Sequence, residues 1–191
     1  MVQSLLRFRF VFVIFFGVSL TAVAIFGEED RKNRDPAEVC KAILLRQDEL
    51  RTLGKLERNT MRIPIWSPKG FEGLAACSID FIFDSPDPEK LHSIEVYVPL
   101  TGKADQVIAN LHGALALRPA NPSEQSFFRS GDLYAEEHPD DPKVYSVIII
   151  RKHKDFVVLF TYLQFSETAI DKSRIHFKYP DGWEDLLKEF E

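Results

Sequence analysis

Two long apolar segments, residues 144–152 and 156–165, constrain the fold more than any other feature of this chain. They are separated by the three residues His153-Lys154-Asp155. In both segments, the side chains that would point to either face of a strand are mostly apolar. A strand that is apolar on both faces is typical of the interior of a covered sheet. The short polar connection predicts a hairpin, so we expect two central antiparallel strands.

Two earlier segments alternate between apolar and polar side chains, as half-buried strands do. They are residues 75–83 and 94–98. The stretch 84–89 between them contains two prolines, which cannot continue a strand ladder. An antiparallel hairpin is therefore the expected arrangement. Residues 127–136 have the pattern of a further extended segment.

Three segments have helical patterns. A helix start is predicted at Asp35-Pro36, and apolar side chains then recur at helical spacing up to about residue 58. Residues 101–117 carry a second apolar stripe, and residues 181–190 a short third one. The prediction is a single α+β domain over residues 36–191 in the order α-β-β-α-β-β-β-α. Its helices pack on a mostly antiparallel sheet of about five strands.

The N-terminal segment has the parts of an export signal. Two arginines precede an uncharged apolar run over residues 10–27, and the small residues Ala22-Val23-Ala24 predict cleavage before Ile25. Residues 1–24 would then be a signal peptide. The alternative is an uncleaved anchor, because a helix over this run would span about 27 Å, close to the hydrocarbon thickness of a bilayer. The body of the protein is expected in the periplasm or outside the cell, or tethered to the inner membrane by residues 10–27.

The chain has two cysteines, Cys40 and Cys77. An oxidising compartment beyond the membrane favours one structural disulfide between them. The alternative is two separate buried thiols, since free cysteine is among the most buried residue types. A redox-active pair is not expected, because the two residues are far apart in the sequence and lack the spacing that lowers a thiol pKa.

Charge limits the classes of partner. Residues 25–35 are highly charged without periodicity, which predicts a flexible tether. The formal net charge of the chain is −5, and no basic stripe is present, so a nucleic-acid partner is not expected. We expect a protein or small-molecule partner outside the cytoplasm and no cofactor. Membrane contact is expected only through the N-terminal segment, if it is uncleaved.

The densest polar cluster is a candidate metal site. Its possible ligands are Glu136, Glu137, His138, Asp140 and Asp141. A calcium loop needs alternating ligands with a glycine at the bend, and a zinc site needs further ligands at fixed spacings. The cluster meets neither requirement. We interpret it as an acidic loop stiffened by two prolines and expect no metal there.

No catalytic residue is assigned from the sequence, since no serine lies in a nucleophile elbow and the five histidines are scattered. Trp66 and Phe71 are candidate binding residues, although Trp66 could instead cover one end of the sheet. The predicted function is a non-enzymatic binding or structural role at an exposed sheet face or edge, which can accept an added strand. The alternatives are a small secreted hydrolase and an inhibitor or immunity-type protein of the cell envelope.

Overall fold

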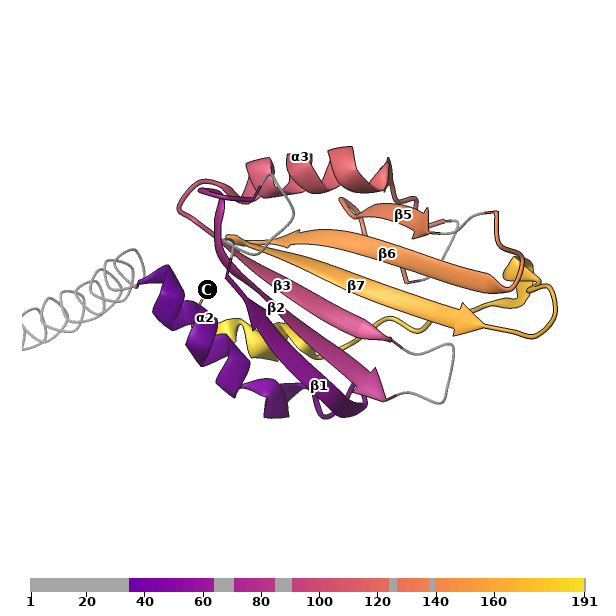
Figure 1. The fold of residues 1–191 in the computed structure, drawn as a ribbon, viewed down its shortest axis with the longest axis horizontal. Helices are drawn as coiled ribbons and strands as arrows, with labels where there is room; N and C mark the ends of the chain where they lie inside the picture. Colours follow the sequence, from indigo (N-terminus) through magenta and orange to yellow (C-terminus); the bar gives the residue numbers. More distant parts are fainter. Residues whose placement is uncertain (1–34, 64–70, 85–90, 124–126, 138–139, 191) are drawn as a thin grey trace, which may run out of the picture. The chain divides into compact units, whose positions relative to one another are not determined.

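A computed structural model shows the strands in one antiparallel sheet (Figure 1). It describes residues 35–63, 71–84, 91–123, 127–137 and 140–190. Within these ranges the α-helices are α2 (Pro36–Leu45) and α3 (Ala104–Leu115). The strands are β1 (Lys55–Arg62), β2 (Ala75–Asp84), β3 (Ser93–Pro99), β4 (Arg118–Pro119), β5 (Leu133–Glu137), β6 (Val144–His153) and β7 (Phe156–Phe165). Short 3-10 turns are η1 (Gln47–Leu50), η3 (Lys172–Arg174), η4 (Trp183–Leu186) and η5 (Lys188–Phe190).

The seven strands lie in the order β1-β2-β3-β7-β6-β5-β4. This order places β7 at the centre, and both of its faces carry buried side chains, as the doubly apolar pattern predicts. The two predicted hairpins are confirmed, because β2 pairs with β3 and β6 pairs with β7, both antiparallel. The sheet is therefore built around the segments with the strongest apolar patterns.

The two faces of the sheet have different covers. In Figure 1, α3 lies along one face, which we call the α3 face, and α2 and the C-terminal 3-10 turns lie on the other, which we call the α2 face. The α2 face buries the larger cluster, whose sheet residues are Cys77, Ile79, Phe81, Phe83, Ile94, Val96, Val98, Val147, Ile149, Phe156, Val158, Phe160 and Tyr162. Its cover contributes Cys40, Ile43, Leu50, Trp183, Leu186 and Leu187. Burying each large apolar side chain stabilises the fold by roughly 1.5–3 kcal/mol.

The α3 face buries a smaller cluster over β5, β6, β7 and the end of β3. Its sheet residues are Tyr97, Ala135, Ile148, Ile150, Val157 and Leu159. Helix α3 covers them with Ala104, Val107 and Leu111, which recur at helical spacing. The helix ends where Ala116 takes a left-handed conformation, with φ of 49°.

The two cysteines form a disulfide, in agreement with the sequence prediction. Cys40 of α2 is bonded to Cys77 of β2, and their Cα atoms lie 6.3 Å apart. Both residues are almost fully buried in the cluster of the α2 face. The bond fastens α2 to the sheet, and it is compatible with an exported protein.

A buried polar network fastens the C-terminal segment to the α2 face. Arg151 of β6 donates two hydrogen bonds to Asp132, of 2.7 and 2.6 Å, and a third to the Tyr179 hydroxyl. The indole nitrogen of Trp183 donates to the same hydroxyl at 3.4 Å. Asp132 is only 2% exposed, and its hydrogen bonds to Arg151 offset the cost of burying the carboxylate.

The structure corrects the predicted element order in three places. The first helix ends at Leu45 rather than near residue 58; the turn η1 follows it, and β1 begins at Lys55, within the last residues of the predicted helix. The sheet has seven strands rather than about five, since β1 and the two-residue β4 were not predicted. The C-terminal segment forms the 3-10 turns η4 and η5 rather than an α-helix, although Trp183 and Leu186 are buried as expected.

The signal, anchor and tether predictions for residues 1–34 lie outside the described residues. Residues Pro36–Glu191 cluster into one compact unit by their contacts. Across the part of the chain that the structure describes, no helix has the length and apolarity to cross a membrane.

Candidate functional site

The best candidate site is the long edge of the sheet at β1. This strand is first in the sheet order, so it pairs with β2 along one side and ends the sheet along the other. Its residues are at most partly buried. At the opposite end of the sheet, β4 has only two residues, and Arg118 lies over the Tyr134 ring at 4.9 Å. The β1 edge is thus the longer of the two.

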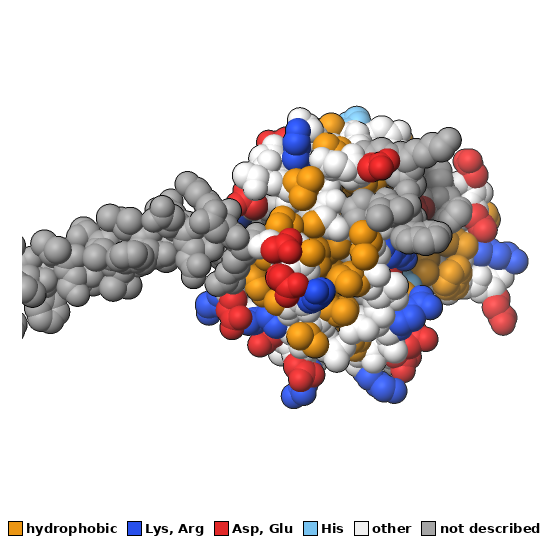
Figure 2. Space-filling view, turned by 60° about the vertical axis from the view of Figure 1, so that its left-hand side comes forward, with side chains coloured by type: hydrophobic (Ala, Val, Ile, Leu, Met, Phe, Trp, Pro, Cys, Tyr) orange, Lys and Arg blue, Asp and Glu red, His pale blue; other side chains and the backbone are white. Residues whose placement is uncertain are grey.

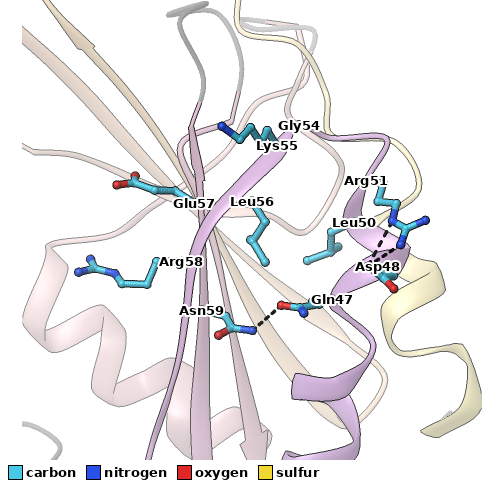
Figure 3. Close-up of a pocket in the computed structure, with 10 residues that line it drawn as sticks. All are labelled: Gln47, Asp48, Leu50, Arg51, Gly54, Lys55, Leu56, Glu57, Arg58 and Asn59. Carbon is cyan, nitrogen blue, oxygen red and sulfur yellow. Dashed lines mark hydrogen bonds and ion pairs between the residues drawn. The ribbon is translucent and has the colours of Figure 1, made fainter.

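A groove of about 740 Å³ runs between β1 and the turn η1 (Figure 3). Its lining residues are Gln47, Asp48, Leu50, Arg51, Gly54, Lys55, Leu56, Glu57, Arg58 and Asn59. In Figure 3 the side chains of Leu50 and Leu56 point toward each other across it. Leu50 is only 1% exposed and Leu56 is partly buried, so the accessible apolar surface of the groove is that of Leu56, and the rim is polar.

Hydrogen bonds hold the two walls of the groove. The Asn59 amide donates to the Gln47 side-chain oxygen at 2.6 Å, which joins β1 to η1 directly. Within the η1 wall, Arg51 pairs with Asp48, with nitrogen and oxygen 2.9 Å apart. Because Asn59 is held by Gln47, the spacing of the two walls is fixed at this point.

A bulge in β1 changes which of its side chains lie on each face of the sheet. The pairing with β2 shifts between Leu56 and Arg58, so that Glu57 has no partner in the register. Leu56 and Met61 pack on the cluster of the α2 face. Lys55, Arg58, Thr60 and Arg62 pair with β2 residues of the other face. In Figure 3, Lys55, Glu57 and Arg58 point away from Leu50 and Gln47.

The basic side chains of β1 lie next to acidic ones of β2. Lys55 is 3.5 Å from Asp84, and Arg62 is 3.6 Å from Asp80. The first pair is well exposed on both sides, and exposed pairs stabilise a fold by no more than about 1 kcal/mol. The Lys55 pair therefore leaves this cation open to exchange its partner, and the Arg62 side chain is itself 53% exposed.

A carboxylate pair lies beside this edge on the α3 face. Asp80 and Glu95 are directly opposite each other in the β2–β3 register. Burial raises the pKa of both carboxyl groups, and for Glu95 the Ser78 hydroxyl and the Arg62 charge act against that rise. Burial and the neighbouring Glu95 likewise raise the pKa of the Tyr97 hydroxyl. Each of the two carboxyl groups therefore keeps its proton to a higher pH than an exposed carboxyl group does.

Phe71, one of the two binding residues predicted from the sequence, lies away from the groove. Phe71 is 6% exposed and packs against the Tyr97 ring, with centroids 5.3 Å apart. Its side chain belongs to the core cluster of the α3 face, so it is not an exposed contact. Trp66 lies outside the described residues, and its binding role stays a prediction.

The sequence-predicted acidic cluster is divided among separate interactions. Glu136 forms an ion pair with Lys172, and Glu137 accepts a 2.8 Å hydrogen bond from Ser146. Asp141 accepts from the backbone of Lys143, and Asp140 is exposed. His138 is outside the described residues. Among the described residues, no group of three or more His, Cys, Asp and Glu side chains is placed to hold a metal ion.

The β1 edge was missed because its bulge hides the strand period. Leu56 and Met61 are five residues apart and would face opposite sides of a regular strand, yet they share one face here. Gly54, just before β1, was the available sign that the preceding helix had ended.

Comparisons with protein-family models, with curated proteins and with solved structures found no match to this chain. The function of the protein is therefore inferred from the geometry of the molecule.

Proposed function

We propose that this chain is an exported, non-enzymatic binding protein that receives an extended peptide segment of a partner along β1. The observation that carries the proposal is an eight-residue edge strand beside a groove in which Leu56 is partly exposed. An extended segment that adds to a sheet edge gains main-chain hydrogen bonds, and pockets beside the edge select alternate side chains. The β1 edge supplies the first feature, and the groove supplies the second.

The groove geometry fits alternate side chains of an added strand. Side chains on one face of a strand recur about every 7 Å, and an eight-residue strand spans about 27 Å. Leu56 is partly exposed and offers an apolar contact, and Gln47 and Asn59 offer polar groups near it. A partner strand would place an apolar side chain against Leu56.

The surface charge also favours a local binding site over a broad electrostatic one. On the face viewed in Figure 2, Lys and Arg side chains are interspersed with Asp and Glu side chains around a group of hydrophobic ones. An inhibitor that captures a basic target would use a contiguous acidic face. The edge site needs no such surface.

The test uses a synthetic peptide as long as β1, in which valine alternates with glutamine, and the chain recovered from an exporting host. Hydrogen exchange of the β1 amides should slow when the peptide is added at millimolar concentration, while exchange in β5 stays unchanged. An analogue methylated on alternate backbone nitrogens should not bind, because it cannot form the ladder. Equal binding of the methylated analogue, or unchanged β1 exchange, would contradict strand addition.

A groove variant checks the location. Gln47→Trp places a large ring in the groove and should weaken peptide binding at least tenfold. Gln106→Trp is the matched control, because Gln106 is exposed on α3, and this helix packs on β6 and β7 rather than at the β1 edge. Equal affinity of the two variants would place the peptide elsewhere on the protein.

A further inference from the structure

We propose that the segment received along β1 is an acidic amphipathic strand, with apolar side chains toward the groove and carboxylates toward the basic side chains of β1. This inference rests on the proposed function and names the chemistry of its partner. It follows from the two rows of side chains, one on each face of β1, whose membership the bulge shifts.

The row of side chains on the α3 face of β1 is basic. It contains Lys55, Arg58 and Arg62, with Thr60 between the two arginines. One acidic residue, Glu57, lies beside them at the bulge. A partner strand lies about 4.8 Å from β1, so this row is the first charge that it meets.

One position of the partner is within reach of both arginines. Side chains directly opposite each other have Cβ atoms about 5 Å apart, and diagonal neighbours are about 7–8 Å apart. A partner residue opposite Thr60 is therefore diagonal to Arg58 and to Arg62 on the same face. An arginine side chain can span that distance, and arginine binds carboxylates through two parallel hydrogen bonds. A glutamate opposite Thr60 would contact either guanidinium group or both.

The acidic residues of β2 lie directly beside these cations, but their ion pairs are long. Lys55 is 3.5 Å from Asp84, and this pair is exposed on both sides. Asp80 is 3.6 Å from Arg62, beyond direct hydrogen-bond length, and burial raises the pKa of its carboxyl group. A carboxylate on an adjacent strand can approach Arg62 from its exposed side, since that side chain is 53% exposed.

A second copy of this chain fits the edge less well than an acidic strand does. If two β1 strands paired antiparallel about their midpoints, Lys55 of one copy would lie opposite Arg62 of the other, and by symmetry this would happen twice. Like charges directly opposite each other in a sheet are destabilising. The charge row therefore disfavours self-association and favours a partner of opposite charge.

The test compares three labelled peptides of the same length, in which valine alternates with glutamate, glutamine or lysine. Two cross-strand charge pairs of about 0.5–1 kcal/mol each correspond to an affinity gain on the order of tenfold. Fluorescence polarisation should rank the peptides glutamate, glutamine, lysine, from tightest to weakest. Equal affinities would overturn the inference while leaving strand addition intact. Binding by none of the peptides would overturn the proposed function itself.

Variants assign the preference to the arginines. Arg58→Gln/Arg62→Gln should remove most of the preference for the glutamate peptide and leave the affinity for the glutamine peptide within about twofold. Arg174→Gln is the matched control, because Arg174 is an exposed arginine on η3 with an ion pair to Asp171. Thermal melting of each variant shows that it is folded. If the double variant keeps the full preference, the basic row of β1 is not its source.

Discussion

The two faces of the sheet share the same strands but differ in how they are covered. The α2 face is closed by a helix, a disulfide and a C-terminal segment fastened through Arg151, and its buried cluster reaches from β2 to β6. The α3 face is covered by one helix, which packs on β6 and β7. Beyond this cluster, the same face of β2 and β3 carries polar and charged side chains such as Ser78, Asp80 and Glu95. Stability is thus concentrated on one face, and the chemistry that could bind a partner lies on the other and at the β1 edge.

The largest expected effect comes from opening the α2 face at Trp183. This side chain is 1% exposed and meets the Phe160 ring edge-on, with centroids 5.1 Å apart. Trp183→Ala should lower the free energy of unfolding by about 3–5 kcal/mol, because it leaves a large cavity. Denaturant unfolding measures the change. A loss below about 1 kcal/mol would mean that the C-terminal segment does not close this face.

The disulfide should have the next largest effect. Cys40 and Cys77 are separated by 37 positions, so the bond restricts a long loop of the unfolded chain. The double variant Cys40→Ala/Cys77→Ala should lose about 2–4 kcal/mol of unfolding free energy. Reductant should destabilise the wild-type protein in denaturant titrations and leave the double variant unaffected. Equal sensitivity of both to reductant would contradict a structural bond.

A matched pair of leucines tests the comparison between the faces directly. Leu186 is completely buried on the α2 face, and Leu111 is 4% exposed on the α3 face. Both truncations to alanine fall in the range of about 2–5 kcal/mol, and we expect Leu111→Ala near its lower end. A single covering helix can shift toward a cavity more readily than a bonded layer can. A larger loss for Leu111→Ala than for Leu186→Ala would reverse the comparison.

The smallest effect is a pH dependence on the polar side of the α3 face. Burial raises the pKa of Asp80 and Glu95 above their ordinary values of 3.8 and 4.5. Their protonated forms therefore favour the folded state, and this contribution is lost as pH rises through the folded pKa values. Glu95→Gln should raise the melting temperature at neutral pH relative to wild type and have little effect near pH 4.

Glu57→Gln is the control for that titration, since Glu57 is an exposed carboxylate on the edge strand. Its melting temperature should follow the wild-type pH dependence. If Glu95→Gln instead lowers the melting temperature at neutral pH, the ionised carboxylate stabilises the fold and the sign of the argument is wrong.

The sequence predicted the centre of the sheet well and its margins poorly. The two hairpins β2–β3 and β6–β7 have regular period-two patterns, and both were expected near their observed bounds. At the margin, the bulge at Glu57 breaks the period of β1, and Leu56 continues the helical spacing of the preceding segment. The local spacing of apolar residues at the start of β1 was therefore compatible with a helix, although the segment forms a strand.

The candidate site depends on pairings that a sequence pattern does not contain. Asp80 and Glu95 are recognisable as the polar positions of two alternating strands, but their contact requires the register of the hairpin. The groove requires η1 to fold back beside β1, and the hydrogen bond between Gln47 and Asn59 joins the two. Neither follows from periodicity alone. The disulfide could be anticipated, because the chain offers one possible pair.

The fastening of the C-terminal segment has a kinetic consequence. Arg46, directly after α2, donates to the Asp185 backbone carbonyl at 2.9 Å, and Trp183 packs on β7. The earliest helix of the domain thus reaches its final environment only after residues almost 140 positions later have been synthesised. Such long-range closure slows folding relative to local contacts. We therefore expect the nascent domain to stay open on its α2 face throughout synthesis and to complete its core in one late step.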